Sequence, residues 1–170
     1  MPVYTGKLVP PPPLAKPSRA FIFEPTDLVP FKTAWDWQKL WQKALLNRAF
    51  EHQAIWMLQH PDCYTIGKGG TNANLLFNLS DPPCDTFRID RGGEVTHHLP
   101  GQLVVYLVLD LYRYKTDLDW YLRKLEDVLI DVLDGLALDG YRIDGMTGVW
   151  CEGKKVGSIG ISCRRWITQH

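Results

Sequence analysis

Three short stretches of the sequence place glycine and polar side chains beside apolar runs. They are QHPDCYTIG (residues 59–67), RGGEVTHHLPGQLVVY (residues 91–106) and GKKVGSIGIS (residues 153–162). Glycine lets a backbone approach a ligand closely and adopt positive φ, so these stretches predict a groove lined by backbone N–H groups. The Arg-Gly-Gly triplet alone fits an ordinary hairpin turn equally well, and only the combination of the three stretches favours a functional site.

The polar side chains in the central stretch suggest how a ligand would be held. Arg91 could orient an anion or a carbonyl group, and Thr96 and His98 could form hydrogen bonds in the same pocket. The adjacent His97 and His98 are expected to face opposite sides of a strand. Since no cysteine or carboxylate stands at a familiar ligand spacing, we predict no metal site and no cofactor.

The last residues combine a lysine, a thiol and an imidazole (His170), a set that suggests covalent catalysis. Cys163 follows Lys155 by eight residues. On one continuous strand that separation is about 25 Å, far beyond a screening length of about 10 Å. Cys163 is therefore expected to be a buried strand thiol rather than a nucleophile. Cys151 should lie nearer the lysines across a turn, whereas Cys63 and Cys84 are weaker candidates.

Apolar periodicity predicts the elements that position these residues. We expect strands within residues 20–25 and 54–67, the latter broken at Pro61, a strand from Gln102 to Leu111, and a hairpin over 147–161 turning at Glu152-Gly153. We expect helices over residues 33–50 and 116–136, the second with a leucine-rich stripe and a solvated charged face. The apolar face expected for the first helix is Trp37, Leu40, Trp41, Ala44 and Leu45. The predicted fold class is α+β, a mixed β-sheet with packed helices.

Size and composition predict one domain over residues 20–170, preceded by a proline-rich tail over residues 1–19. The formal net charge of zero offers no electrostatic basis for tight, nonspecific nucleic-acid binding. No apolar run reaches the roughly 18 residues that a membrane helix needs. Prolines interrupt any apolar core of a secretory signal. We therefore expect a soluble, intracellular protein with free cysteines.

The three stretches, followed by W-x-TQH at the end of the sequence, resemble the octanoyltransferases, also called lipoyl(octanoyl) transferases or lipoate-protein ligase B. The resemblance covers roughly residues 54–170. It implies the fold of the biotin- and lipoate-protein ligase catalytic domains, and transfer of an octanoyl or lipoyl group from acyl carrier protein to a lysine of lipoyl-dependent enzyme domains. The implied partners are octanoyl-acyl carrier protein, the lipoyl domains of 2-oxoacid dehydrogenase complexes and the glycine cleavage H protein. The implied location is the cytoplasm.

The resemblance also assigns roles to individual residues. Lys155 corresponds to the family's catalytic lysine, whose charge supports a cysteine thiolate, and Lys154 is its neighbour. Ser158, Ile159 and Gly160 correspond to one acyl-binding segment. The other acyl-binding segment comprises Arg91, Gly92, Gly93, Glu94, Val95, Thr96, His97 and His98.

The family's nucleophilic cysteine lies in a Pro-Cys-Gly-like segment beyond the equivalent of His170, and this sequence contains no such segment. We therefore expect a catalytic domain missing its C-terminal segment, and no octanoyl-thioester on this chain. Two alternatives remain open. One is a noncatalytic acyl-binding remnant, and the other is an ATP-dependent lipoate- or biotin-protein ligase, which needs no cysteine. The GGEVTHHLPGQLV segment is closer to the transferase pattern.

Overall fold

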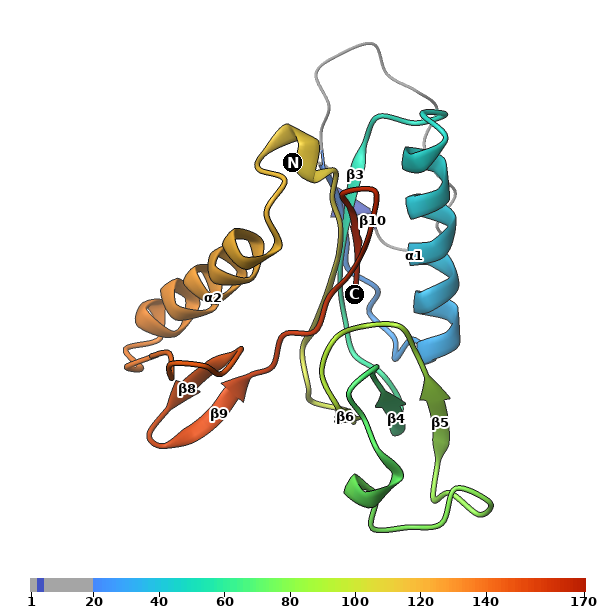
Figure 1. The fold of residues 1–170 in the computed structure, drawn as a ribbon, viewed down its shortest axis with the longest axis vertical. Helices are drawn as coiled ribbons and strands as arrows, with labels where there is room; N and C mark the ends of the chain where they lie inside the picture. The colour runs from blue at the N-terminus through green and yellow to red at the C-terminus, as the bar shows by residue number, and fades with distance from the viewer. Residues whose placement is uncertain (1–2, 5–19) are drawn as a thin grey trace. The chain divides into compact units, whose positions relative to one another are not determined.

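The structure is a computed structural model that describes residues 3–4 and 20–170 (Figure 1). The predicted proline-rich tail lies outside the described residues, except for Val3–Tyr4, which pair in parallel with the strand that begins at Ala20. The elements mix strands with two α-helices, which confirms the predicted α+β class. In chain order they are β1 (Val3–Tyr4), β2 (Ala20–Phe23), α1 (Phe31–Leu46), β3 (Gln53–Leu58), β4 (Cys63–Ile66), β5 (Asp85–Arg88), β6 (Val95–His98), β7 (Val104–Val108), α2 (Leu118–Gly135), β8 (Val149–Cys151), β9 (Lys154–Gly157), β10 (Ser162–Arg164) and β11 (Ile167–Gln169).

The described chain divides into two compact units. The first contains the residues up to Asp110 together with Ile161–His170, and the second is Leu111–Gly160. All strands except β8 and β9 belong to the first unit, and α2 belongs to the second. That residues 20–170 act as a single catalytic domain stays a prediction.

The core of the first unit forms where α1 packs on a mixed sheet. The strand order is β1-β2-β3-β7, with β2 parallel to β3 and β7 antiparallel to it. Phe23, Trp41 and Trp56 are buried together, and the Trp41 ring lies 5.4 Å from that of Phe23 and 5.7 Å from that of Trp56. Large aromatic side chains supply much of the apolar area that stabilises a small core.

The buried face of α1 differs from the predicted one. Leu40 is 53% exposed, whereas the polar Gln38 and Gln42 are buried. Gln38 Oε1 accepts the backbone N–H of His170, and Gln42 Nε2 donates to the carbonyl oxygen of Ile167. These amides lie inside because β11 and the residue after it offer them backbone partners, a feature that apolar periodicity does not record.

The end of the chain forms a hairpin, β10–β11, that the sequence analysis did not predict. Its turn residues Arg165 and Trp166 have φ of 48° and 61°. Thr168 Oγ1 donates to the carbonyl oxygen of Leu107 at 2.9 Å, which ties β11 to β7. Because β9 ends at Gly157 and β10 begins at Ser162, the single strand assumed between Lys155 and Cys163 is wrong.

The second unit contains α2 and the β8–β9 hairpin. The Asp117 side chain caps α2 by accepting the Trp120 N–H at 3.0 Å. The predicted hairpin is confirmed, and Glu152 and Gly153 form its turn with φ of 50° and 74°. Part of the predicted apolar stripe of α2 is exposed, Val128 and Val132 among it. Neither α-helix of the described chain is long and apolar enough to cross a membrane.

Candidate active site

The loop between β5 and β6 carries the Arg-Gly-Gly triplet and lies against the segment that follows β4. The amides of residues 67–69 donate to the carbonyl oxygens of residues 91, 93 and 94 at 2.8 to 3.0 Å. A Cβ on Gly67 would lie 2.4 Å from the Gly93 oxygen, so this contact requires glycine. These three amides therefore bind the loop, and the groove of backbone donors predicted from the glycines cannot include them.

Arg91 is buried, with 8% of its surface exposed. Its Nη2 donates to the carbonyl oxygen and Oγ1 of Thr65, at 3.1 and 2.9 Å, and to Thr96 Oγ1 at 2.9 Å. Its Nη1 donates to the Gly92 oxygen at 2.9 Å. Burial lowers the pKa of Arg91, but an arginine remains charged at neutral pH. This cation ties β4 and β6 together through uncharged oxygens.

The two adjacent histidines face opposite sides of β6, as predicted. His97 is exposed and its ring stacks on that of Tyr64 at 4.3 Å. His98 is buried, and burial lowers its pKa to about 4, so it is neutral at neutral pH. Its Nδ1–H donates to Gln102 Oε1 at 2.8 Å, which leaves Nε2, 3.3 Å from Thr65 Oγ1, as an acceptor.

A second buried histidine extends this polar cluster, and the sequence analysis did not single it out. His60 is fully buried, with Nδ1 at 2.5 Å from the Val29 oxygen and Nε2 at 2.8 Å from the Tyr106 hydroxyl. Its ring lies 5.3 Å from that of His98. Both His60 and Tyr106 stand within the glycine-containing stretches, but nothing in the sequence distinguishes them from ordinary core residues.

The remaining predicted site residues belong to the second unit. Lys155 lies on β9 directly opposite Trp150 of β8, and its Nζ is 5.1 Å from the centroid of the Trp150 ring. Ser158, Ile159 and Gly160 follow β9, with Ser158 exposed and the other two half-buried. The structure thus brings residues 91–98 together in one unit, and Lys155 with residues 158–160 in the other.

The four cysteines are free, and three have thiols that ionise less readily than usual. Burial in β4 raises the pKa of Cys63 to about 12. Partial burial also raises the pKa of Cys84 and that of Cys163, which lies on a strand, β10, as predicted but is half-buried rather than buried. Cys151 is buried opposite Lys154. Within residues 20–170, no three His, Cys, Asp or Glu side chains gather closely enough to hold a metal ion.

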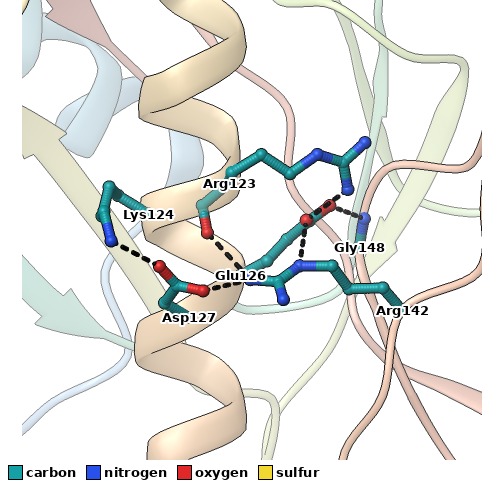
Figure 2. A network of polar contacts seen from close by, with 6 residues as sticks. All are labelled: Arg123, Lys124, Glu126, Asp127, Arg142 and Gly148. Carbon is teal, nitrogen blue, oxygen red and sulfur yellow. Dashed lines mark hydrogen bonds and ion pairs between the residues drawn. The ribbon is translucent and has the colours of Figure 1, made fainter.

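One charged residue of α2 departs from the predicted solvated face. Glu126 is fully buried, and its carboxylate binds two arginines and the backbone N–H of Gly148 (Figure 2). Burial raises the pKa of Glu126, but the bonds from Gly148, Arg142 and Arg123 outweigh it, and the net pKa is lowered. A charge pattern alone does not reveal which carboxylate of a helix has buried partners.

Comparison with known proteins gives consistent matches. Residues 31–170, which span both units, match the model of the lipoyl protein ligase A/B catalytic domain family. An octanoyltransferase of Prochlorococcus marinus strain SARG is 72% identical over 149 residues, covering 88% of this chain and 66% of the relative. That of strain MIT 9313 is 58% identical over the whole chain and 70% of the relative. This chain thus spans just under two thirds of the first relative's length.

A solved structure extends the likeness at the level of the fold. A bipartite lipoate protein ligase from Thermoplasma acidophilum, described with its E2 lipoyl domain, superposes with a TM-score of 0.55. The sequence identity is 19%, and the match covers 89% of this chain and 58% of the other. The predicted lipoate-protein ligase fold is therefore confirmed.

Proposed function

Because the chain belongs to the lipoyl protein ligase A/B catalytic domain family, we propose that it serves the transfer of an octanoyl group from acyl carrier protein to a lysine of lipoyl domains. The observation that carries this proposal is the 72% sequence identity between this chain and an octanoyltransferase, over 88% of the chain. The glycine cleavage H protein and the lipoyl domains of 2-oxoacid dehydrogenase complexes are the proposed acceptors. A cytoplasmic location stays a prediction.

The proposed chemistry passes through an acyl-cysteine thioester. A thiolate attacks the thioester of the octanoyl carrier, the carrier thiolate leaves, and the acceptor amine then displaces the enzyme's thiolate. A nearby ammonium increases the thiolate fraction, the role proposed for Lys155. Residues 91–98 and Ser158, Ile159 and Gly160 are the proposed acyl-binding segments.

We propose that the nucleophile is none of the four cysteines of this sequence. The pKa of Cys63 is raised to about 12, and those of Cys84 and Cys163 are also raised. A thiol with a raised pKa supplies little thiolate at neutral pH. Cys151 is buried within the β8–β9 hairpin, which limits its access to a carrier-bound acyl group.

Intact-protein mass spectrometry after incubation with octanoyl-acyl carrier protein tests the assignment on this chain. We expect no thiol-dependent octanoyl adduct on residues 1–170. A stable adduct that disappears in a Cys151→Ser or Cys63→Ser variant would make that cysteine the nucleophile. The ATP-dependent ligase alternative is tested in the same sample, because formation of an octanoyl- or lipoyl-adenylate from the free acid and ATP would favour it over the transferase.

A further inference from the structure

The side chain of Lys155 lies against a defined surface within the second unit. Trp150 is its cross-strand neighbour, and the ammonium lies over the indole ring at 5.1 Å from the centroid. At this separation a cation is attracted to the face of an aromatic ring. The β8–β9 pairing shifts by one residue between Trp150 and Val149, which forms a β-bulge at Val156 next to Lys155. Such bulges re-aim side chains.

Gly148 forms the second wall of this surface. A Cβ on Gly148 would lie 2.5 Å from Lys155 Cε and 3.2 Å from its Nζ. It would also lie 2.5 Å from the carbonyl oxygen of Gly157. The φ of Gly148 is 130°, a conformation that other residues rarely adopt. The Lys155 side chain therefore packs directly against the backbone of Gly148, and its position depends on the position of that backbone. We call Gly148 and Trp150 the lysine seat.

A buried carboxylate holds the seat from the side of α2. Glu126 Oε1 accepts the N–H of Gly148 at 2.9 Å. Its other oxygen accepts from Arg123 Nη1 at 2.6 Å and from Arg142 Nε at 2.8 Å (Figure 2). Arg142 in turn donates to the Arg123 carbonyl oxygen and to Asp127. Glu126 is fully buried while the two arginines are half-exposed, and three donors on its two oxygens hold the carboxylate in one position.

The same segment also anchors Trp150. Tyr141, next to Arg142, exchanges backbone N–H···O bonds with Trp150 at 2.8 Å in both directions. The Tyr141 hydroxyl accepts the N–H of Gly153 in the hairpin turn at 3.1 Å. Both parts of the lysine seat are thereby connected to the Glu126–Arg142 pair.

We propose that Glu126 is a positioning residue for Lys155, acting through Gly148. Glu126 fixes the Gly148 amide, Gly148 and Trp150 fix the path of the lysine side chain, and the ammonium is thereby presented at one place. This inference rests on the proposed function for its catalytic meaning, although the positioning itself is a property of the second unit. A lysine side chain has many rotamers of similar energy, so packing against the lysine seat restricts it to one position.

The test measures the seat directly by NMR on the 170-residue chain. The ring current of Trp150 should shift the ε-methylene proton resonance of Lys155 upfield. The Lys155→Arg variant assigns this resonance, because the resonance disappears. The Trp150→Leu variant gives the unshifted reference position. In Glu126→Gln, which keeps the side-chain volume but places an amide against two arginines and the Gly148 amide, most of the upfield shift should be lost. Gly148→Ala should cause the same loss by direct displacement.

Asp127→Asn is the matched control, because it removes a neighbouring α2 carboxylate that binds Arg142 but not Gly148. It should retain the shift. If Glu126→Gln does not fold, Glu126→Asp keeps the charge but draws the carboxylate away from Gly148, and the same loss is expected. A folded Glu126 variant with the full wild-type shift would overturn the inference.

A kinetic measurement connects the seat to catalysis. In an octanoyl transfer assay on the protein expressed from its complete gene, Glu126→Gln should lower kcat by about 10- to 100-fold with KM for the octanoyl carrier unchanged, since small misplacements of reacting groups have effects of this size. An unchanged kcat despite a lost ring-current shift would overturn the catalytic role of the seat. Absence of transfer by the wild-type protein expressed from its complete gene, with the shift present and sensitive to Glu126, would instead refute the proposed function alone.

Discussion

Three buried side chains of the candidate site form a chain of hydrogen bonds with a consistent assignment of protons. Arg91 Nη2 donates to Thr65 Oγ1, and the Thr65 hydroxyl is then free to donate to Nε2 of neutral His98. The single ring N–H of neutral His98, on Nδ1, donates to Gln102 Oε1. If His98 were protonated, its Nε2–H would be a second donor directed at Thr65 Oγ1, beside Arg91 Nη2. The imidazolium would also be a second cation near Arg91. The network therefore depends on His98 being neutral.

His98 should make stability fall with acid. Its pKa is about 4 in the folded protein against 6.5 ordinarily, so between these values the unfolded chain binds more protons. The contribution of neutral His98 to the unfolding free energy is fully present above pH 6.5. It is lost as the pH drops toward 4, and the loss for this residue is up to about 3 kcal/mol. Urea unfolding at pH 7 and pH 5 measures the loss. His60 and His170, whose pKa values are also lowered by burial, should add to it.

The variants His98→Gln and His97→Gln separate this residue from the general effect of acid. The first should flatten the pH dependence of the unfolding free energy. The second, on the exposed side of the same strand, should leave it as in the wild type. Equal pH dependence in wild type and His98→Gln would show that His98 is not held neutral.

At the scale of elements, periodicity located most helices and strands but missed those that depend on distant partners. The helices, the strand pair on either side of Pro61 and the Glu152-Gly153 hairpin follow from local patterns. The buried face of α1 and the β10–β11 hairpin do not, because Gln38, Gln42 and Thr168 are satisfied by backbone groups far away in sequence. The burial of Glu126 was missed for the same reason.

The packing of the β5–β6 loop on the end of β4 can be tested by adding one methyl group, the Cβ of alanine, at Gly67. In Gly67→Ala the added Cβ would lie 2.4 Å from the Gly93 oxygen and 2.9 Å from Arg91 Nη1, so the loop must move. We expect a loss of about 1–3 kcal/mol in unfolding free energy, the usual cost of overpacking. Gly69→Ala is the matched control, since its Cβ would be 3.3 Å from the same oxygen and the loss should be smaller. Equal stabilities of the two variants would contradict the close approach at Gly67.

At the scale of the whole molecule, the sequence motifs predicted the family correctly, and the family match spans both compact units. The motifs could identify Lys155 by resemblance but not the surface on which it lies. That surface is made by Gly148, Trp150 and, behind them, Glu126, residues that no local pattern connects. Neighbouring Lys154 lies on the same strand, opposite Cys151, and provides an internal comparison for Lys155.

Octanoyl transfer that depends on Lys155 can be measured in a single assay. The protein expressed from its complete gene is mixed with octanoyl-acyl carrier protein and a lipoyl domain without ATP, and the mass of the lipoyl domain is followed with time. We predict that the domain gains one octanoyl group, that Lys155→Ala slows the gain by about 10²- to 10⁴-fold, and that Lys154→Ala stays near wild type. Modification that requires ATP would contradict the transferase activity, and equal rates for the Lys155→Ala variant and the wild type would contradict the role of Lys155.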